Sequence, residues 1–174
     1  MNGIRTTIIL GITVLLVWSC ASEHFQIEIE PSGTRVVKGV FERNVLEHDS
    51  AFTWYRTNYE AYAVDPTMIQ DIAAHSEDVR FVLVLGTWCG DSKREVPELF
   101  KIFDAAKVGD DEILMLGVDR SKKSKDGLTE KYNVQRVPTL IVLKGDQELG
   151  RIVEQPRETL ERDIAHILQK QLVH

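Results

Sequence analysis

The sequence contains only two cysteines, Cys20 and Cys89, among 174 residues. This length suits one domain with a sizeable core plus an extension. If Cys20 is modified, a single thiol remains and no internal disulfide can form, which leaves that thiol open to oxidation and to mixed disulfides. No metal site is expected, because the histidines that accompany this thiol are scattered along the chain: His24, His48, His75, His166 and His174.

The chain also has fewer positively charged than negatively charged residues. The chain has 21 lysines and arginines against 27 aspartates and glutamates, for a net charge of -6. Nucleic-acid binding requires a basic surface, so a nucleic-acid partner is not expected. The one short basic run, at Lys122, Lys123 and Lys125, is interpreted as a solvated loop.

An apolar run long enough to span a bilayer, about 20 residues, is missing as well. The uncharged stretch Ile8–Trp18 follows Arg5 and precedes small residues, an order typical of a secretory signal over residues 1–19. Val17-Trp18-Ser19-Cys20 resembles the lipobox of bacterial lipoproteins. That resemblance implies lipidation of Cys20 and a membrane anchor on the periplasmic or outer side of a bacterial cell envelope. A plain signal peptide cut nearby, with Cys20 incidental, is the alternative.

Hydrophobic periodicity predicts an α/β domain after this signal. Residues 20–35 are expected to be a tether, residues 36–75 an N-terminal extension that packs on the core, and residues 76–174 the main domain. Because strands alternate with helices, parallel pairing is expected, with an antiparallel edge from the closing hairpin. The predicted strands cover 36–41, 80–86, 112–119, 139–143 and 150–153, and the predicted helices cover 51–63, 66–75, 92–107, 128–132 and a last one from about 156.

Cys89 directly follows a buried strand and opens an amphipathic helix. The first turn of a helix has unpaired N–H groups and partial positive charge, which favour the nucleophilic thiolate over the thiol. Gly90 would allow a tight turn. The hydroxyl of Ser92 is predicted to donate a hydrogen bond to the sulfur, with Trp88 and Asp91 on the rim of the site.

Several separated motifs carry a family resemblance. Residues 87–92, Thr-Trp-Cys-Gly-Asp-Ser, resemble the Trp-Cys-Gly-x-Cys loop of thioredoxins. Pro97 matches that family's helix-kinking proline, residues 137–139 its cis-proline segment, and residues 144–146 its hairpin turn. Residues 86–97 narrow the resemblance to thioredoxin-domain lipoproteins of the Bacteroidetes type. The resemblance to thioredoxins implies a thioredoxin fold, which is a central mixed sheet flanked by helices.

The same resemblance shows what this chain lacks. Ser92 stands where the family has its resolving cysteine, Leu83 where it has a buried aspartate, and Met115 where it has the lysine that accompanies this aspartate. Those charges assist proton transfer to the second cysteine. Their joint absence is consistent with a site rebuilt around one thiol.

The expected function is therefore single-cysteine thiol–disulfide exchange with other envelope proteins. Cys89 and Ser92 are the expected catalytic residues, Val137 and Pro138 are expected to position the substrate, and no cofactor is required. Release of the substrate needs an external thiol or a reductase partner. A non-catalytic binding or holding module is the alternative. Peroxide reduction is disfavoured, because Thr87 lies two residues before Cys89 rather than three and Val82 replaces the proline of that motif.

Overall fold

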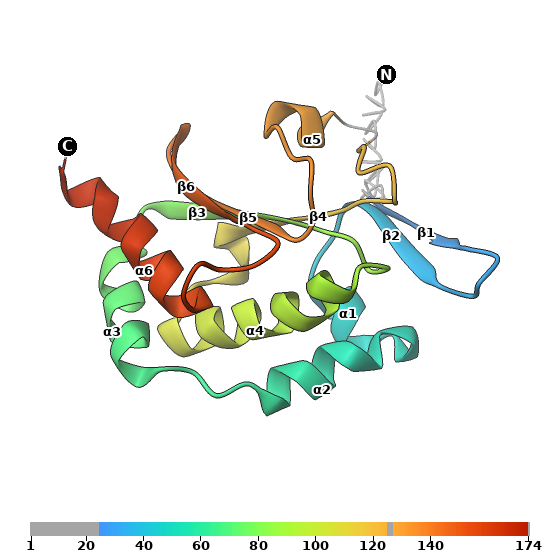
Figure 1. Cartoon of the computed structure of the whole chain (residues 1–174), viewed down its shortest axis with the longest axis horizontal. Coiled ribbons are helices and arrows are strands. Elements are labelled where there is room, and N and C mark those ends of the chain that lie inside the picture. The colour runs from blue at the N-terminus through green and yellow to red at the C-terminus, as the bar shows by residue number, and fades with distance from the viewer. Residues whose placement is uncertain (1–24, 125–126, 174) are drawn as a thin grey trace, which may run out of the picture.

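The computed structural model describes residues 25–124 and 127–173 (Figure 1). The expected signal over 1–19 and the expected lipidation site Cys20 lie outside these residues. None of the described helices is both long and apolar enough to cross a membrane.

Within the described residues, six strands form one sheet in the order β1-β2-β4-β3-β5-β6. Only β3 and β4 are parallel, and all other neighbours are antiparallel. The sheet is mixed, as expected, but it contains less parallel pairing than the alternation of helices and strands predicted. The strands are β1 (Phe25–Ile29), β2 (Arg35–Val40), β3 (Val79–Leu85), β4 (Ile113–Gly117), β5 (Thr139–Lys144) and β6 (Gln147–Val153).

Strand β5 runs antiparallel to its neighbour β3. After β4 the chain forms the four-residue helix α5 (Leu128–Lys131) and starts β5 at the end of the sheet where β4 stops. Thr139, the first residue of β5, therefore pairs with Val84 near the carboxyl end of β3.

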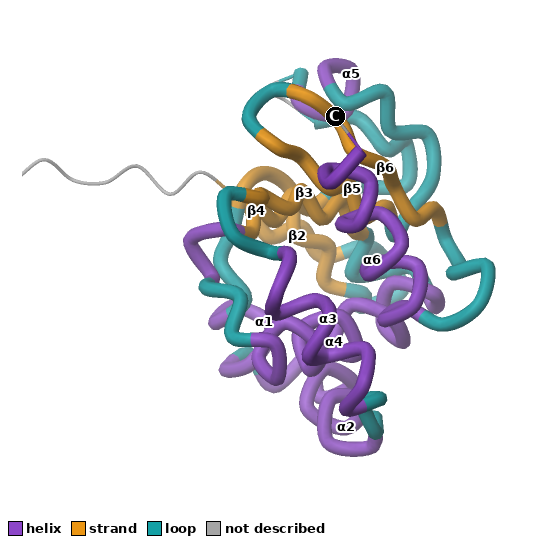
Figure 2. Tube along the Cα trace, turned by 90° about the vertical axis from the view of Figure 1, so that its left-hand side faces the viewer, coloured by secondary structure: helices purple, strands orange, loops and turns teal. Residues whose placement is uncertain are grey.

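The helices are distributed unevenly over the two faces of the sheet. Figures 1 and 2 show α2, α3 and α4 on one side and α5 on the other. Short 3-10 turns occupy Ser50–Phe52, Asp110–Glu112 and Lys170–Val173. Besides α5, the helices are α1 (Asn44–His48), α2 (Thr53–Ala61), α3 (Pro66–His75), α4 (Gly90–Ala106) and α6 (Leu160–Gln169).

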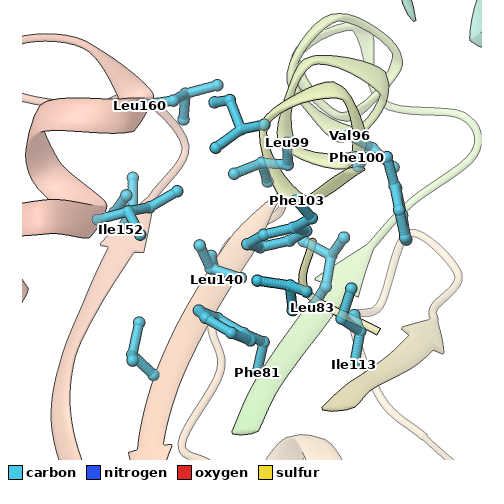
Figure 3. Packing of buried hydrophobic residues seen from close by; sticks show 14 of the residues in the cluster. Phe81, Leu83, Val96, Leu99, Phe100, Phe103, Ile113, Leu140, Ile152 and Leu160 are labelled. Carbon is cyan, nitrogen blue, oxygen red and sulfur yellow. The ribbon is translucent and has the colours of Figure 1, made fainter. Parts of the chain in front are cut away.

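The main core lies between the sheet and α4, with α3 and α6 beside it. Phe81 of β3 meets Phe103 of α4 with ring centroids 4.7 Å apart (Figure 3). Leu83, fully buried, lies in this apolar layer. Complete burial of one such side chain contributes about 1.5–3 kcal/mol, so this layer holds the helix that carries Cys89 against the sheet.

The N-terminal region differs from the prediction. Within the expected tether 20–35, residues from Phe25 to Ile29 form β1, which pairs with β2. The alternation of Phe25, Ile27 and Ile29 is a strand pattern, and Phe25 packs on Phe41 with ring centroids 6.1 Å apart.

The last helix also starts later than predicted, at Leu160 rather than near 156. The Asp163 carboxylate accepts hydrogen bonds from the N–H groups of Arg157 and Glu158, which keeps those residues outside the helix. Thr159 then caps the first turn by accepting from the Arg162 N–H at 3.3 Å.

Helix α2 supports α4 at its proline. Pro97 has no N–H, so the carbonyl of Lys93 has no intrahelical partner at the usual position. The Asn58 side chain donates to this carbonyl at 2.8 Å. Asn58, which precedes the central strand in the sequence, thus satisfies the backbone beside the proline of α4.

Candidate active site

Cys89 is placed between the central strand and the long helix. It is the N-cap residue of α4, with φ -85° and ψ 130°, and its N–H donates to the Gly86 carbonyl at 2.8 Å. The thiol is free and partly exposed. At this position the first N–H groups of the helix have no partner within the helix.

The structure brings Cys89 together with the predicted proline segment. The thiol donates a hydrogen bond to the Val137 carbonyl, with 3.3 Å between sulfur and oxygen. The Val137–Pro138 peptide bond is cis. Two segments 48 residues apart in the sequence therefore form one site.

Ser92 does not make the predicted bond to the sulfur. Its side chain is fully buried, and its Oγ accepts from the Gly86 N–H at 3.2 Å. Within the described chain, no hydrogen bond joins Ser92 to Cys89. Gly86 directly follows the last residue of β3, so this hydrogen bond joins the end of β3 to the first turn of α4.

Leu83 and Met115 are directly paired in the parallel ladder of β3 and β4. Both are buried, with 0% and 3% of their surface exposed. The two positions at which the sequence lacks a charged pair are thus neighbours, and an apolar pair fills the space. An ionised group left there alone would be strongly destabilised, so the two replacements belong together.

The other loop residues form the rim. Trp88 donates from Nε1 to the Val118 carbonyl at 2.9 Å, and its ring lies so close to Gly86 that a Cβ there would come within 2.7 Å of it. Asp91 accepts from Arg94 at 2.8 Å. Gly90 is exposed with φ outside the left-handed region, and a Cβ on it would contact nothing. The expected tight turn therefore does not explain this glycine.

Glu95 is a residue that the sequence analysis missed. It lies on α4 six positions after Cys89 and is only 3% exposed. Arg94 bridges it to the active loop, with 2.8 Å to Glu95 Oε1 and 2.8 Å to Asp91 Oδ1. Burial raises the pKa of Glu95 to about 7, helped by the charges of Asp91 and Glu98 and opposed by Arg94. Glu95 lies on the same helix face as the buried residues Ser92 and Leu99, and this spacing is the sequence signal that could have predicted its burial.

No three histidine, cysteine, aspartate or glutamate side chains gather into a possible metal site within residues 25–124 and 127–173. His48 and His75 each bond through Nδ1 to a carbonyl of their own helix, those of Asn44 and Asp71.

Comparison with known proteins identifies the family. The sequence model of the thioredoxin family matches residues 62–166. The thioredoxin of Staphylococcus aureus is 37% identical over 95 residues, which are 54% of this chain and 83% of that protein. The chain therefore belongs to the thioredoxin family. The match begins before α3, whereas the sequence pattern places α3 in the N-terminal extension.

Solved structures show the same fold at lower identity. A protein of unknown function from Pseudomonas aeruginosa is 17% identical with a TM-score of 0.50, covering 74% of this chain and 89% of that chain. An HIV epitope-scaffold is 16% identical with a TM-score of 0.51, covering 75% and 91%. At these identities the likeness concerns the thioredoxin fold alone.

Proposed function

We propose that this protein is an envelope-anchored monothiol exchange protein that forms mixed disulfides with other envelope proteins through Cys89. One observation carries the proposal: the free thiol at the start of α4 faces the Val137 carbonyl, while the residue three positions later is a buried serine. Such a thiol can attack a disulfide, and once Cys20 carries lipid the chain offers it no internal thiol for release.

The chemistry has two exchanges. The Cys89 thiolate attacks one sulfur of a partner's disulfide, a new S–S bond forms, and the partner's other sulfur leaves as a thiolate that takes a proton from solvent. An external thiolate then attacks the partner's sulfur in the mixed disulfide. Cys89 leaves as thiolate, and the partner remains in a disulfide with the external thiol. No net oxidation of Cys89 occurs.

The backbone beside Pro138 suits an extended substrate. The Pro138 carbonyl already accepts from the Glu154 N–H at 2.8 Å, and the Val137 carbonyl accepts from Cys89. The Val137 N–H has no partner in the described part of the chain. A substrate segment that adds as a strand can accept from this N–H while its disulfide lies at Cys89.

Exchange is tested by non-reducing gels of cells that express the full chain. We expect bands of higher mass that reductant removes and that disappear in Cys89→Ser, because an alcohol does not attack a disulfide. In the matched variant Cys20→Ser, the Cys89 adducts should persist. If wild-type cells give no such bands under either oxidising or reducing growth conditions, the exchange role is wrong, and the binding-module alternative is preferred.

We also propose that Cys20 carries the lipid anchor, on the order of charged, apolar and small residues before it. Because β1 starts at Phe25, an anchored chain would hold the hairpin within about 18 Å of Cys20. The wild type should sediment with membranes and carry acyl chains by mass spectrometry, and Cys20→Ser should be released into the soluble fraction. Cys89→Ser is the control and should stay with membranes. An unacylated, freely soluble wild type would refute the anchor.

A further inference from the structure

The Trp88 side chain is held from three sides beside Cys89. Gly86 lies under its ring, the Val118 carbonyl accepts from its Nε1, and the Arg120 guanidinium lies over the ring, 4.9 Å from the centroid. A guanidinium at this distance from an indole makes a favourable cation–π contact. Nothing in the exchange chemistry above uses Arg120.

Arg120 is itself held by the N-terminal hairpin. Its Nε and Nη2 donate to the two carboxylate oxygens of Glu30, at 2.7 and 2.9 Å. This two-pronged geometry fixes the plane of the guanidinium. Glu30 directly follows β1, and its N–H donates to the Thr34 carbonyl at 2.9 Å, which closes the hairpin tip. The Glu30–Arg120 ion pair joins residues 90 positions apart in the sequence, and through Arg120 it connects the hairpin tip to Trp88.

The hairpin is attached to the same loop at a second point. The buried Thr87 hydroxyl donates to the Arg35 carbonyl at 2.8 Å and accepts from the Val37 N–H at 3.2 Å. Figure 1 shows the β1–β2 hairpin projecting past the sheet at the end where β3 leads into α4. The two residues before Cys89 are therefore both positioned by the hairpin, Thr87 directly and Trp88 through Arg120.

We propose that Glu30 and Arg120 are positioning residues that hold the Trp88 ring in a fixed orientation, so that its exposed part forms a rim on which a protein substrate docks while Cys89 attacks its disulfide. This inference rests on the exchange function proposed above. A protein that contacts the rim gains from a fixed indole, whereas a small disulfide reaches the partly exposed thiol without it. The hairpin then acts on the choice of substrate and not on the sulfur chemistry.

The test compares two disulfides on the purified full chain. Rates of Cys89 adduct formation are measured with insulin and with neutral bis(2-hydroxyethyl) disulfide. All proteins carry Trp18→Phe and Trp54→Phe, so that Trp88 is the only tryptophan and its emission can be followed. Arg120→Lys keeps the charge but loses the planar stack. We expect it to react about threefold more slowly with insulin, at an unchanged rate with the small disulfide, and with altered Trp88 emission.

Two further variants separate positioning from a structural role. The charge swap Glu30→Arg with Arg120→Glu restores an ion pair but leaves no cation over the ring, so the insulin rate should stay low. Arg56→Lys alters a matched exposed ion pair on α2, 2.9 Å from Glu60, and should change neither rate. A swap that restores the insulin rate, or an Arg120→Lys protein that matches the parent in both rates and emission, would overturn the inference. A parent that reacts with neither disulfide would instead refute the proposed function.

Discussion

Ser92→Cys is expected to shorten the lifetime of the mixed disulfide by at least about 100-fold at millimolar external thiol. The new thiol would stand at the third helical position after the N-cap residue Cys89, and side chains at these two positions approach each other across the first turn of a helix. We therefore expect the two sulfurs to come within bonding distance after modest movement. Because the attack becomes intramolecular, release no longer depends on the external thiol concentration.

The measurement is the decay of a purified Cys89–insulin adduct, followed by mass spectrometry at several glutathione concentrations. The wild-type rate should rise in proportion to glutathione, and the Ser92→Cys rate should not. Ser92→Ala is the matched control. It removes the hydroxyl that accepts from Gly86, which costs about 1–3 kcal/mol of stability, but the adduct should decay as in the wild type. A Ser92→Cys adduct that still needs glutathione would show that position 92 cannot reach the sulfur.

The sequence predicted best those parts of the fold that have a local sequence pattern. A capping residue before a proline marks the start of α3, and the structure has Asp65 as its N-cap, accepting from the N–H groups of Thr67 and Met68. The continuous apolar run that predicts a central strand is β3, paired on both sides. The sequence alone shows Leu83 and Met115 as two separate missing charges, whereas the ladder register makes them one pair.

What the sequence analysis missed depends on contacts between distant or exposed residues. Glu30 and Arg120 are polar residues in separate segments, and no sequence pattern relates them. Only the folded β1–β2 hairpin brings Glu30 to Arg120. The hydroxyl of Ser92 had two possible partners, and only the folded end of β3 decides for the Gly86 N–H. Glu95 reads as one more charge on an amphipathic helix, although its neighbours bury it.

The burial of Glu95 makes the stability of the protein depend on pH. Its ordinary pKa is 4.5, and its pKa in the folded protein is about 7. Between these values the folded state keeps a proton that the unfolded state has lost. The free energy of unfolding therefore falls as pH rises from about 4.5 to about 7 and levels off above that. The gap corresponds to roughly 3 kcal/mol, much of the stability of a typical domain.

Glu95→Gln should remove this decline, since an amide stays neutral at every pH. Urea unfolding should find the variant about as stable as the wild type at pH 4 and more stable by up to about 3 kcal/mol at pH 8. Glu98, whose pKa burial also raises, is present in both proteins, so the pH dependence from its own burial remains in the Glu95→Gln curve. Glu60→Gln, on the exposed side of α2, should stay within about 0.5 kcal/mol of the wild type throughout. Parallel curves for Glu95→Gln and wild type would mean that Glu95 remains ionised in the folded protein, with Arg94 compensating its burial in full.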